Sequence, residues 1–162
     1  MIKVGILVIS DKASRGERKD ESGPIMKEII KKLPAEVSEY KVIPDEKDQI
    51  KENLINWVDK LGLDLILTSG GTGIGPRDVT PEATKEVIEK ELPGFVEAMR
   101  IKGLEKTPFS MLSRAIAGTR KKSLIINLPG SPKAVKENLE VVLPAVKHGI
   151  EILKGEISKC GR

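Results

Sequence analysis

The chain has 162 residues, of which 39% are hydrophobic and 32% are charged, so it is long enough for a sizeable core and too short to expect two domains. We therefore expect a single domain over residues 1–162. No apolar run approaches the roughly 18 residues that a membrane-spanning helix needs, and the alternating N-terminal segment has no small-residue cleavage pattern, so we expect a cytoplasmic protein with no membrane partner.

The net charge of +4 is mild and suits an anionic small molecule or plain solubility. Nucleic acid is not expected as a partner, because only 2% of the residues are aromatic and single strands are bound by several stacking side chains. Cys160, the single cysteine, has no partner for an internal disulfide, and His148, the single histidine, is expected on the solvated face of a helix. Oxygen atoms must therefore hold any metal ion.

In chain order, apolar runs and helical spacings predict a strand at 4–9, a helix at 25–33, a strand at 37–43, a helix at 50–61, a strand at 63–67, a helix at 83–92, a strand at 124–128 and a helix at 132–153. Only the run at 37–43 alternates, so we expect it near a sheet edge. The segment 94–118 is less regular and predicts helical pieces with turns at Gly103 and Pro108. Pro144 should kink the last helix.

Strands that alternate with helices predict an α/β fold, a three-layer sandwich with a mainly parallel central sheet flanked by helices. In such sheets ligands bind outside the carboxyl ends of the strands. The loops that follow the four strands are therefore the candidate binding segments. The first, at residues 10–23, is long and heavily charged, and the second places Asp45 at this edge.

The third loop, TSGGTGIGPRDVT at residues 68–80, is longer than the two to six residues that usually connect a strand to a helix. Its glycines free the backbone to approach a ligand and to turn N–H groups toward an anion, and Thr80 predicts the N-cap of the next helix. The fourth loop repeats this logic, with Gly130 in a tight turn, Ser131 as a cap and Pro132 at the first helical position. Two such loops predict a phosphate-bearing ligand, although the common nucleotide-binding fingerprints are absent.

Asp45 and Asp78 lie next to these predicted phosphate sites. Carboxylates repel phosphates unless a divalent cation lies between them, and oxygen ligands combined with phosphate suit Mg²⁺, so both aspartates are predicted to hold this metal. Arg77 has two interpretations. It neutralises charge on a transferred phosphoryl or nucleotidyl group, or it forms an exposed salt bridge.

Several motifs resemble the MogA and MoaB proteins of molybdenum-cofactor biosynthesis, which are related to domains of plant and animal fusion proteins. The resemblance covers nearly the whole chain, and the version with Arg77, Asp78 and Val79 resembles MogA more than MoaB. The motifs are ISDKAS from residue 9, Pro44-Asp45, SGGTGIGPRDVTPEAT from residue 69, LPGF from residue 92, LSRAIAG from residue 112 and LPGSPKAV from residue 128.

This resemblance implies a molybdopterin adenylyltransferase that uses ATP and Mg²⁺ and releases pyrophosphate before molybdate is inserted. It implies a homotrimer that works with the molybdenum insertase of the same pathway. The family's two functional aspartates correspond to Asp45 and Asp78. Nucleotide or pterin phosphates are expected at two loops and at three further pocket residues, namely Ser69, Gly70, Gly71, Thr72 and Gly73, then Pro129, Gly130, Ser131 and Pro132, and finally Ser10, Asp11 and Glu82; Arg77 and Thr80 complete the predicted binding set.

Two positions depart from the family pattern. Lys12 stands where many relatives carry Arg, which puts a bidentate phosphate contact in doubt, and Ser131 stands where others carry Asn or Gln. Two other functions remain open from the sequence. One is a trimeric carrier or scaffold that binds molybdopterin without catalysis, and the other is a nucleotidyl transferase that acts on a different phosphate ligand.

Overall fold

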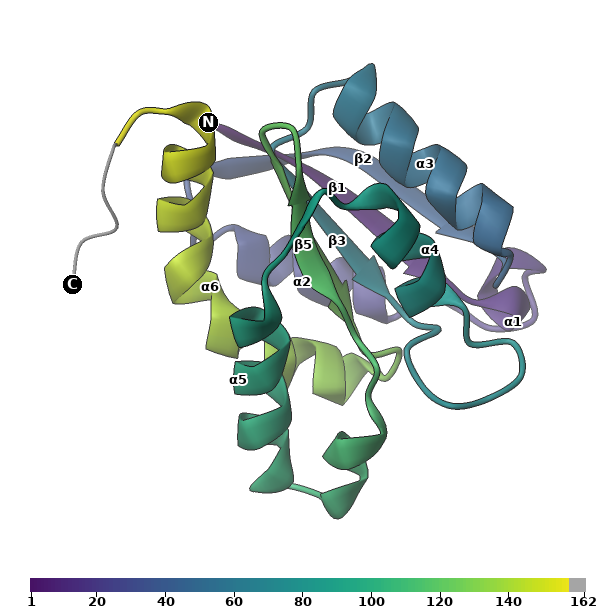
Figure 1. The fold of residues 1–162 in the computed structure, drawn as a ribbon. Helices are drawn as coiled ribbons and strands as arrows, with labels where there is room; N and C mark the ends of the chain where they lie inside the picture. The colour runs from purple at the N-terminus through teal and green to yellow at the C-terminus, as the bar shows by residue number, and fades with distance from the viewer. Residues whose placement is uncertain (158–162) are drawn as a thin grey trace.

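Six strands form one sheet in the order β2-β1-β3-β6-β5-β4 (Figure 1). The computed structural model describes residues 1–157, so Cys160 lies outside the described part. The elements are β1 (Ile2–Ile9), α1 (Asp11–Ser14), α2 (Ser22–Ile30), β2 (Ala35–Ile43), α3 (Lys47–Asp59), β3 (Leu65–Ser69), α4 (Thr80–Val87), β4 (Lys90–Glu91), α5 (Pro93–Leu104), the 3₁₀ helix η1 (Pro108–Leu112), β5 (Ala117–Arg120), β6 (Ser123–Leu128) and α6 (Pro132–Lys154).

The central strands β1, β3 and β6 and the edge strand β2 are parallel, which confirms the predicted α/β sheet. Strands β3 and β6 are buried at every position, as continuous apolar runs require, whereas β2 alternates between partly buried and exposed residues. The prediction that residues 37–43 form an edge strand is therefore correct. The carboxyl ends of β1, β3 and β6 meet at one edge of the sheet.

Two apolar cores cover the two faces of the sheet. Helices α2, α5 and α6 pack on one face, where side chains such as Ile6 and Leu67 point, and α3 and α4 pack on the other, with Leu7 and Ile66 (Figure 1). Gly5 in β1 makes room for the Trp57 ring, because a Cβ at Gly5 would lie 2.6 Å from it. These layers confirm the sandwich that the alternating strands and helices predict.

The structure corrects three predicted elements. The third strand begins at Leu65, two residues later than expected. The helix expected at 83–92 ends at Val87, because Ile88 adopts an extended backbone, and Leu92 packs against the core on the other face of the sheet. The antiparallel strands β4 and β5 were not predicted, since their short segments carry little apolar alternation.

Pro144 and His148 both lie in the last helix, α6. Pro144 lies inside α6, which remains one uninterrupted helix from Pro132 to Lys154. His148 is only partly exposed, and its Nε2 is buried with no hydrogen-bond partner in the described structure. The expectation of a solvated His148 ring is therefore wrong for this nitrogen.

Candidate functional site

A cavity of about 740 Å³ opens at the carboxyl ends of β1, β3 and β6. The loops and helix ends that surround it come from segments far apart in the sequence, because the parallel strands bring their ends to one edge. Most of the predicted binding residues line this cavity, namely Ser10, Asp45, Ser69, Gly70, Gly71, Asp78, Gly130, Ser131 and Pro132.

The glycine-rich loop at residues 70–79 begins in close contact with two other strand ends. Gly70 has a φ of 103°, a region that favours glycine, and a Cβ at this position would collide with Ile9 O. Gly70 N donates to Leu128 O at 3.1 Å, and Ser69 Oγ donates to Pro129 O at 2.9 Å. The first, third and fourth loops are therefore held together at the floor of the cavity.

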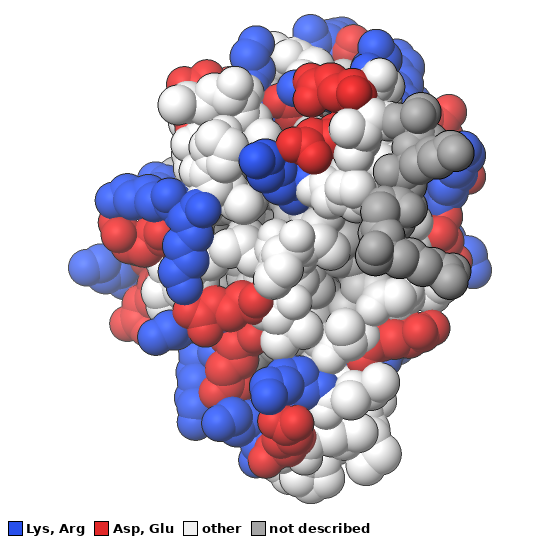
Figure 2. Space-filling model, turned by 90° about the vertical axis from the view of Figure 1, so that its left-hand side faces the viewer, with Lys and Arg blue, Asp and Glu red and all other residues white. Residues whose placement is uncertain are grey.

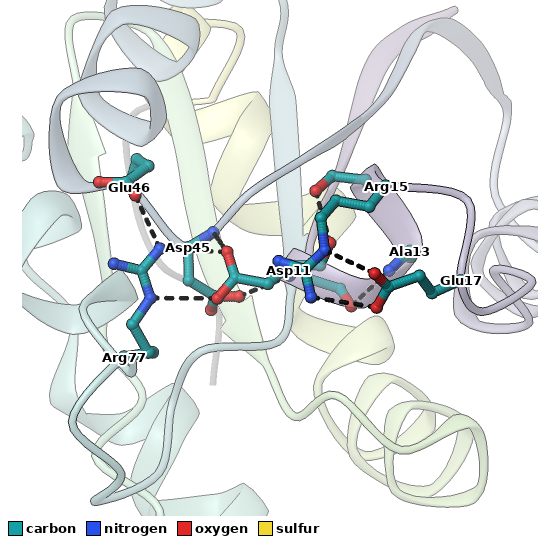
Figure 3. A network of polar contacts seen from close by, with 9 residues as sticks. Asp11, Ala13, Arg15, Glu17, Asp45, Glu46 and Arg77 are labelled. Carbon is teal, nitrogen blue, oxygen red and sulfur yellow. Dashed lines mark hydrogen bonds and ion pairs between the residues drawn. The ribbon is translucent and has the colours of Figure 1, made fainter.

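Asp45 and Asp11 exchange hydrogen bonds across the loops that follow β1 and β2 (Figure 3). Asp11 N donates to Asp45 Oδ2 at 2.8 Å, and Asp45 N donates to Asp11 Oδ1 at 3.0 Å. Burial raises the pKa of Asp45, and the charges of Asp11 and Asp78 add to this effect. By contrast, the hydrogen bond from Arg77 lowers the pKa of Asp11.

Asp78 comes from the far end of the glycine-rich loop and lines the same cavity as Asp45. Its Oδ2 accepts a hydrogen bond from Gly75 N at 2.9 Å, so the carboxylate folds back over the loop's own backbone. The charge of Asp78 raises the pKa of Asp45, as expected for two carboxylates that face one space. The structure thus brings the two predicted aspartates to one cavity.

Arg77 does not line the cavity. Its Nε and Nη2 donate to the two carboxylate oxygens of Asp11, both at 3.1 Å, and Nη2 also donates to Glu46 Oε1 at 2.7 Å (Figure 3). These carboxylates raise the pKa of Arg77 further above its ordinary value. Of the two interpretations from the sequence, the structure shows the exposed salt bridge.

Two helices begin directly after the third and fourth loops, α4 at Thr80 and α6 at Pro132. Ser131 is the N-cap of α6, where its Oγ accepts from Ala134 N at 3.2 Å, as predicted. At α4 the N-cap is Val79, which corrects the assignment of Thr80 as the cap. Thr80 instead is fully buried, and its hydroxyl donates to Gly70 O at 2.9 Å, so it closes the base of the loop.

Other predicted residues lie behind the glycine-rich loop. Thr72, Gly73 and Pro129 line a separate cavity of about 270 Å³ next to α5 and η1. Glu82 forms an ion pair with Arg114 outside both cavities. The sequence placed all four in one pocket, because position in the chain does not reveal which side of a loop a residue faces.

The structure adds residues that the sequence did not single out. Arg18, Lys19, Asp20, Glu21 and Ser22 line the cavity from the end of the first loop. Asp20 accepts hydrogen bonds from the N–H groups of Ser22 and Gly23 at the start of α2, and Ser22 Oγ donates to Gly130 O at 3.0 Å. The only signal in the sequence was the length and charge of this loop.

Arg18 and Lys19 are the two cations of the cavity wall, and both are exposed. Neither forms an ion pair or a side-chain hydrogen bond within residues 1–157, whereas the neighbouring Arg15 is paired with Glu17 at 3.0 Å (Figure 3). Their positive charges are therefore available to an anion in the cavity.

The donor set fits a Mg²⁺ ion that is shared with substrate phosphates. Across residues 1–157, no three His, Cys, Asp or Glu side chains are gathered into a metal site made by the protein alone. Mg²⁺ in phosphate-transfer sites is commonly held by one or two carboxylates together with phosphate oxygens and water. Asp45 and Asp78 supply two such carboxylates in the cavity.

Positive and negative side chains are mixed on one face of the molecule. Figure 2 shows Lys and Arg interspersed with Asp and Glu on the side that carries α5 and α6, without a continuous basic area among the residues described there. Within residues 1–157 no helix has the length and apolar character to span a membrane.

Comparison with known proteins identifies the family. A model described as a probable molybdopterin binding domain matches residues 5–148. The molybdopterin adenylyltransferase of Helicobacter pylori strain J99 is 46% identical over 157 residues, which cover 95% of this chain and 89% of that protein.

Solved structures agree with this assignment. The molybdopterin biosynthesis enzyme MoaB from Thermus thermophilus is 51% identical, with a TM-score of 0.92 over 98% of this chain and 100% of that one. A MogA structure is 38% identical, with a TM-score of 0.89 over 93% of this chain and 99% of that one. This chain therefore belongs to the molybdopterin-binding domain family that includes the MogA and MoaB proteins.

Proposed function

We propose that the protein is a single-domain molybdopterin adenylyltransferase. It transfers AMP from Mg·ATP to the terminal phosphate of molybdopterin and releases pyrophosphate. The observation that carries the proposal is the pairing of Asp45 and Asp78 in one cavity between two loops suited to phosphate. The activity named for the Helicobacter pylori relative, at 46% identity, supports the same reaction.

The reaction needs positioning more than acid–base chemistry. A phosphate monoester has a second pKa near 6, so the attacking phosphate is already largely ionised near neutral pH and no general base is required. The oxygen of that phosphate attacks the α-phosphorus of ATP, and the bond from this phosphorus to the pyrophosphate oxygen breaks. The protein must therefore align two polyanions and compensate their charge.

Different parts of the cavity would share this task. The backbone N–H of Gly71 would donate to a phosphate oxygen, and the N-terminus of α6 at Ser131 and Pro132 would present its helix dipole to the same anion. Arg18 and Lys19 would add positive charge from the first loop. Asp11, Arg77, Thr80 and Glu82, which the sequence places in the binding set, are proposed to support the loops instead of touching the substrates.

Asp45 and Asp78 would hold the metal ion. When bound there, Mg²⁺ neutralises phosphate charge and polarises the phosphoryl group. The raised pKa of Asp45 agrees with this role, because a buried carboxylate next to another carboxylate is unfavourable unless a cation compensates the charge. The metal would thus offset the repulsion between the two carboxylates.

The wider setting is also a proposal. We propose that the enzyme works in the cytoplasm and that its adenylylated product passes to the molybdenum insertase of the pathway. Self-association, which we propose gives a homotrimer, is supported by large apolar side chains that α5 and η1 expose, namely Ile101, Leu104, Phe109, Met111 and Leu112. The motif Arg77, Asp78 and Val79 supports the MogA type of activity.

The test is pyrophosphate release from purified protein mixed with ATP, Mg²⁺ and molybdopterin. We expect release by the unchanged protein and a decrease of about 100-fold or more in Asp78→Asn and in Asp45→Asn, with a raised Mg²⁺ requirement. Asp48→Asn is the matched control, because Asp48 is exposed on α3 and does not line the cavity. This control should keep the original rate.

The same experiment separates the alternatives. Tight molybdopterin binding without pyrophosphate release would identify a carrier or scaffold. Release with another phosphate acceptor, but not with molybdopterin, would identify a different nucleotidyl transferase. Lost activity with an unchanged Mg²⁺ response in Asp78→Asn would contradict the metal-holding role.

A further inference from the structure

The glycine-rich loop at residues 70–79 carries Asp78 to the cavity with few hydrogen bonds of its own. Its tip, residues 74–77, is exposed, and it is crossed by two contacts between Gly75 and Asp78, at 2.9 and 3.1 Å. Glycines lose more conformational freedom on folding than other residues. A loop with four of them needs contacts from outside to keep a carboxylate in one place.

Arg114, which lies between η1 and β5, supplies such contacts on both sides of the loop tip. Its backbone N–H donates to Thr72 O at 2.9 Å, and its Nε donates to Gly73 O at 2.7 Å. Its Nη2 donates to Asp78 O at 2.9 Å. One residue therefore binds the loop before the tip and again at the residue whose carboxylate faces the cavity.

The third arm of the guanidinium reaches the helix that follows the loop. Arg114 Nη1 donates to both carboxylate oxygens of Glu82, in the first turn of α4. A planar guanidinium directs its donors in fixed directions, so these contacts define the relative positions of the two loop arms and the helix. Lysine has one ammonium group on a flexible chain and cannot make the same set.

The chain on either side of Arg114 is fixed by hydrogen bonds to other elements. Ser113 O accepts a hydrogen bond from Arg100 Nη1 of α5 at 3.2 Å, and Ile116 N donates to the buried Asn127 Oδ1 at 3.1 Å. Arg114 does not line the cavity that holds Asp45 and Asp78. We therefore expect it to affect the reaction through the loop and the helix that it contacts.

We propose that Arg114 is a positioning residue that holds the carboxylate of Asp78 at the cavity by clamping both arms of the glycine-rich loop. Its link to catalysis rests on the proposed function, because Asp78 is there a metal ligand. The clamp itself is a statement about loop conformation. The two parts can be tested by different measurements on the same variants.

The first variant is Arg114→Lys, which keeps the positive charge and loses the planar guanidinium with its several N–H donors. We expect amide hydrogen exchange within residues 71–79, where the N–H groups of Gly75 and Asp78 are hydrogen-bonded, to accelerate by about tenfold or more in the substrate-free protein, as the loss of one or two supporting hydrogen bonds implies. We also expect the Mg²⁺ concentration for half-maximal pyrophosphate release to rise roughly 10- to 100-fold, the usual effect of removing support from a metal ligand.

The control is Arg120→Lys. Arg120 makes the same kinds of contact, two to the carboxylate of Asp59 and one to Val87 O at 3.0 Å, but it does not touch the loop. Its change should leave both loop exchange and the Mg²⁺ requirement unaltered. Glu82→Gln should change loop exchange and the Mg²⁺ requirement far less than Arg114→Lys does, because the contacts from Arg114 to Gly73 O and Asp78 O remain.

The assignment is overturned if Arg114→Lys leaves the exchange of residues 71–79 unchanged, or if Arg120→Lys accelerates it equally. It is also overturned if loop exchange rises while the Mg²⁺ requirement of an active enzyme stays the same. If the unchanged protein releases no pyrophosphate, the proposed function fails, and the exchange data alone decide whether Arg114 clamps the loop.

Discussion

Asp11 and Asp45 have pKa values shifted in opposite directions, although the backbone N–H of each donates to the carboxylate of the other. Asp11 faces Arg77, whose hydrogen bonds stabilise its charged form, while Asp45 is partly buried next to other carboxylates. Asp11 joins two loops through its bonds with Arg77 and with the backbone of Asp45. In the proposed function, Asp45 is the carboxylate whose charged form a cation would stabilise.

Tyr40 gives a test of the cavity wall at the scale of one residue. Burial and the hydrogen bond to Asp20 raise the pKa of Tyr40 to about 12, from an ordinary value near 10. Because the folded pKa is the higher one, this contact stabilises the fold below about pH 10, and the contribution is lost as the pH rises through about 12.

Since Tyr40 is the only tyrosine, its ionisation can be followed by ultraviolet absorbance. We expect a midpoint near 12 in the folded protein and near 10 in denaturant. Circular dichroism on the same samples shows that the fold is retained. A folded midpoint near 10 would mean that Asp20 does not accept this hydrogen bond, and the account of the first loop would be wrong.

Glycine has opposite effects on the stability of the fold at two positions, the end of β3 and the interior of α6. Gly70 lies where β3 ends, at a φ of 103° and against Ile9 O, so the loop depends on the missing side chain. Gly149 lies inside α6 with nothing near the place of a Cβ. In a helix interior a glycine costs about 0.5–1 kcal/mol relative to alanine.

These two positions give a paired prediction. Gly149→Ala should raise the free energy of unfolding by about 0.5–1 kcal/mol, and Gly70→Ala should lower it by more than about 2 kcal/mol through backbone strain and collision. Urea unfolding at one fixed protein concentration measures both. Equal effects of the two changes would show that the close approach of Gly70 to β1 is not present in solution.

At the scale of elements, much of the fold follows from the sequence. Continuous apolar runs defined β1, β3 and β6, and the alternating run at residues 37–43 defined the edge strand β2. The strands β4 and β5 could not be predicted in this way. Lys90–Glu91 has two residues and no apolar pattern, and it becomes a strand only because Ala117–Arg120 lies beside it.

At the scale of the whole molecule, the glycine-rich loop lies between the cavity and a second region. Gly70, Gly71 and Asp78 of the loop line the cavity that also contains Asp45, and Thr72 and Gly73 line the smaller cavity beside α5 and η1. The exposed apolar side chains of α5 and η1 lie in that second region. Association through this surface would place a neighbouring subunit close to the segment that holds Arg114.

Light scattering after size exclusion tests this association. We expect a mass of about three times 17.7 kDa for the unchanged protein and a smaller species for Met111→Asp, because the charge would be buried in an apolar interface. Leu61→Asp is the control, since Leu61 is 43% exposed at the end of α3, away from this surface. A mass that is unchanged by Met111→Asp would exclude η1 from the interface.

By itself, the sequence determined the parallel sheet, the loops at the carboxyl ends of its strands and the two aspartates, Asp45 and Asp78, that line one cavity there. These features depend on local patterns, namely apolar runs, glycines and caps near a strand end, and motifs read directly from the chain. Only the tertiary structure decided that Arg77 pairs with Asp11, that Arg18 and Lys19 line the cavity, and that Arg114 holds the loop. Each of these depends on which side of a loop faces which neighbour, and packing between segments up to about a hundred residues apart sets that orientation.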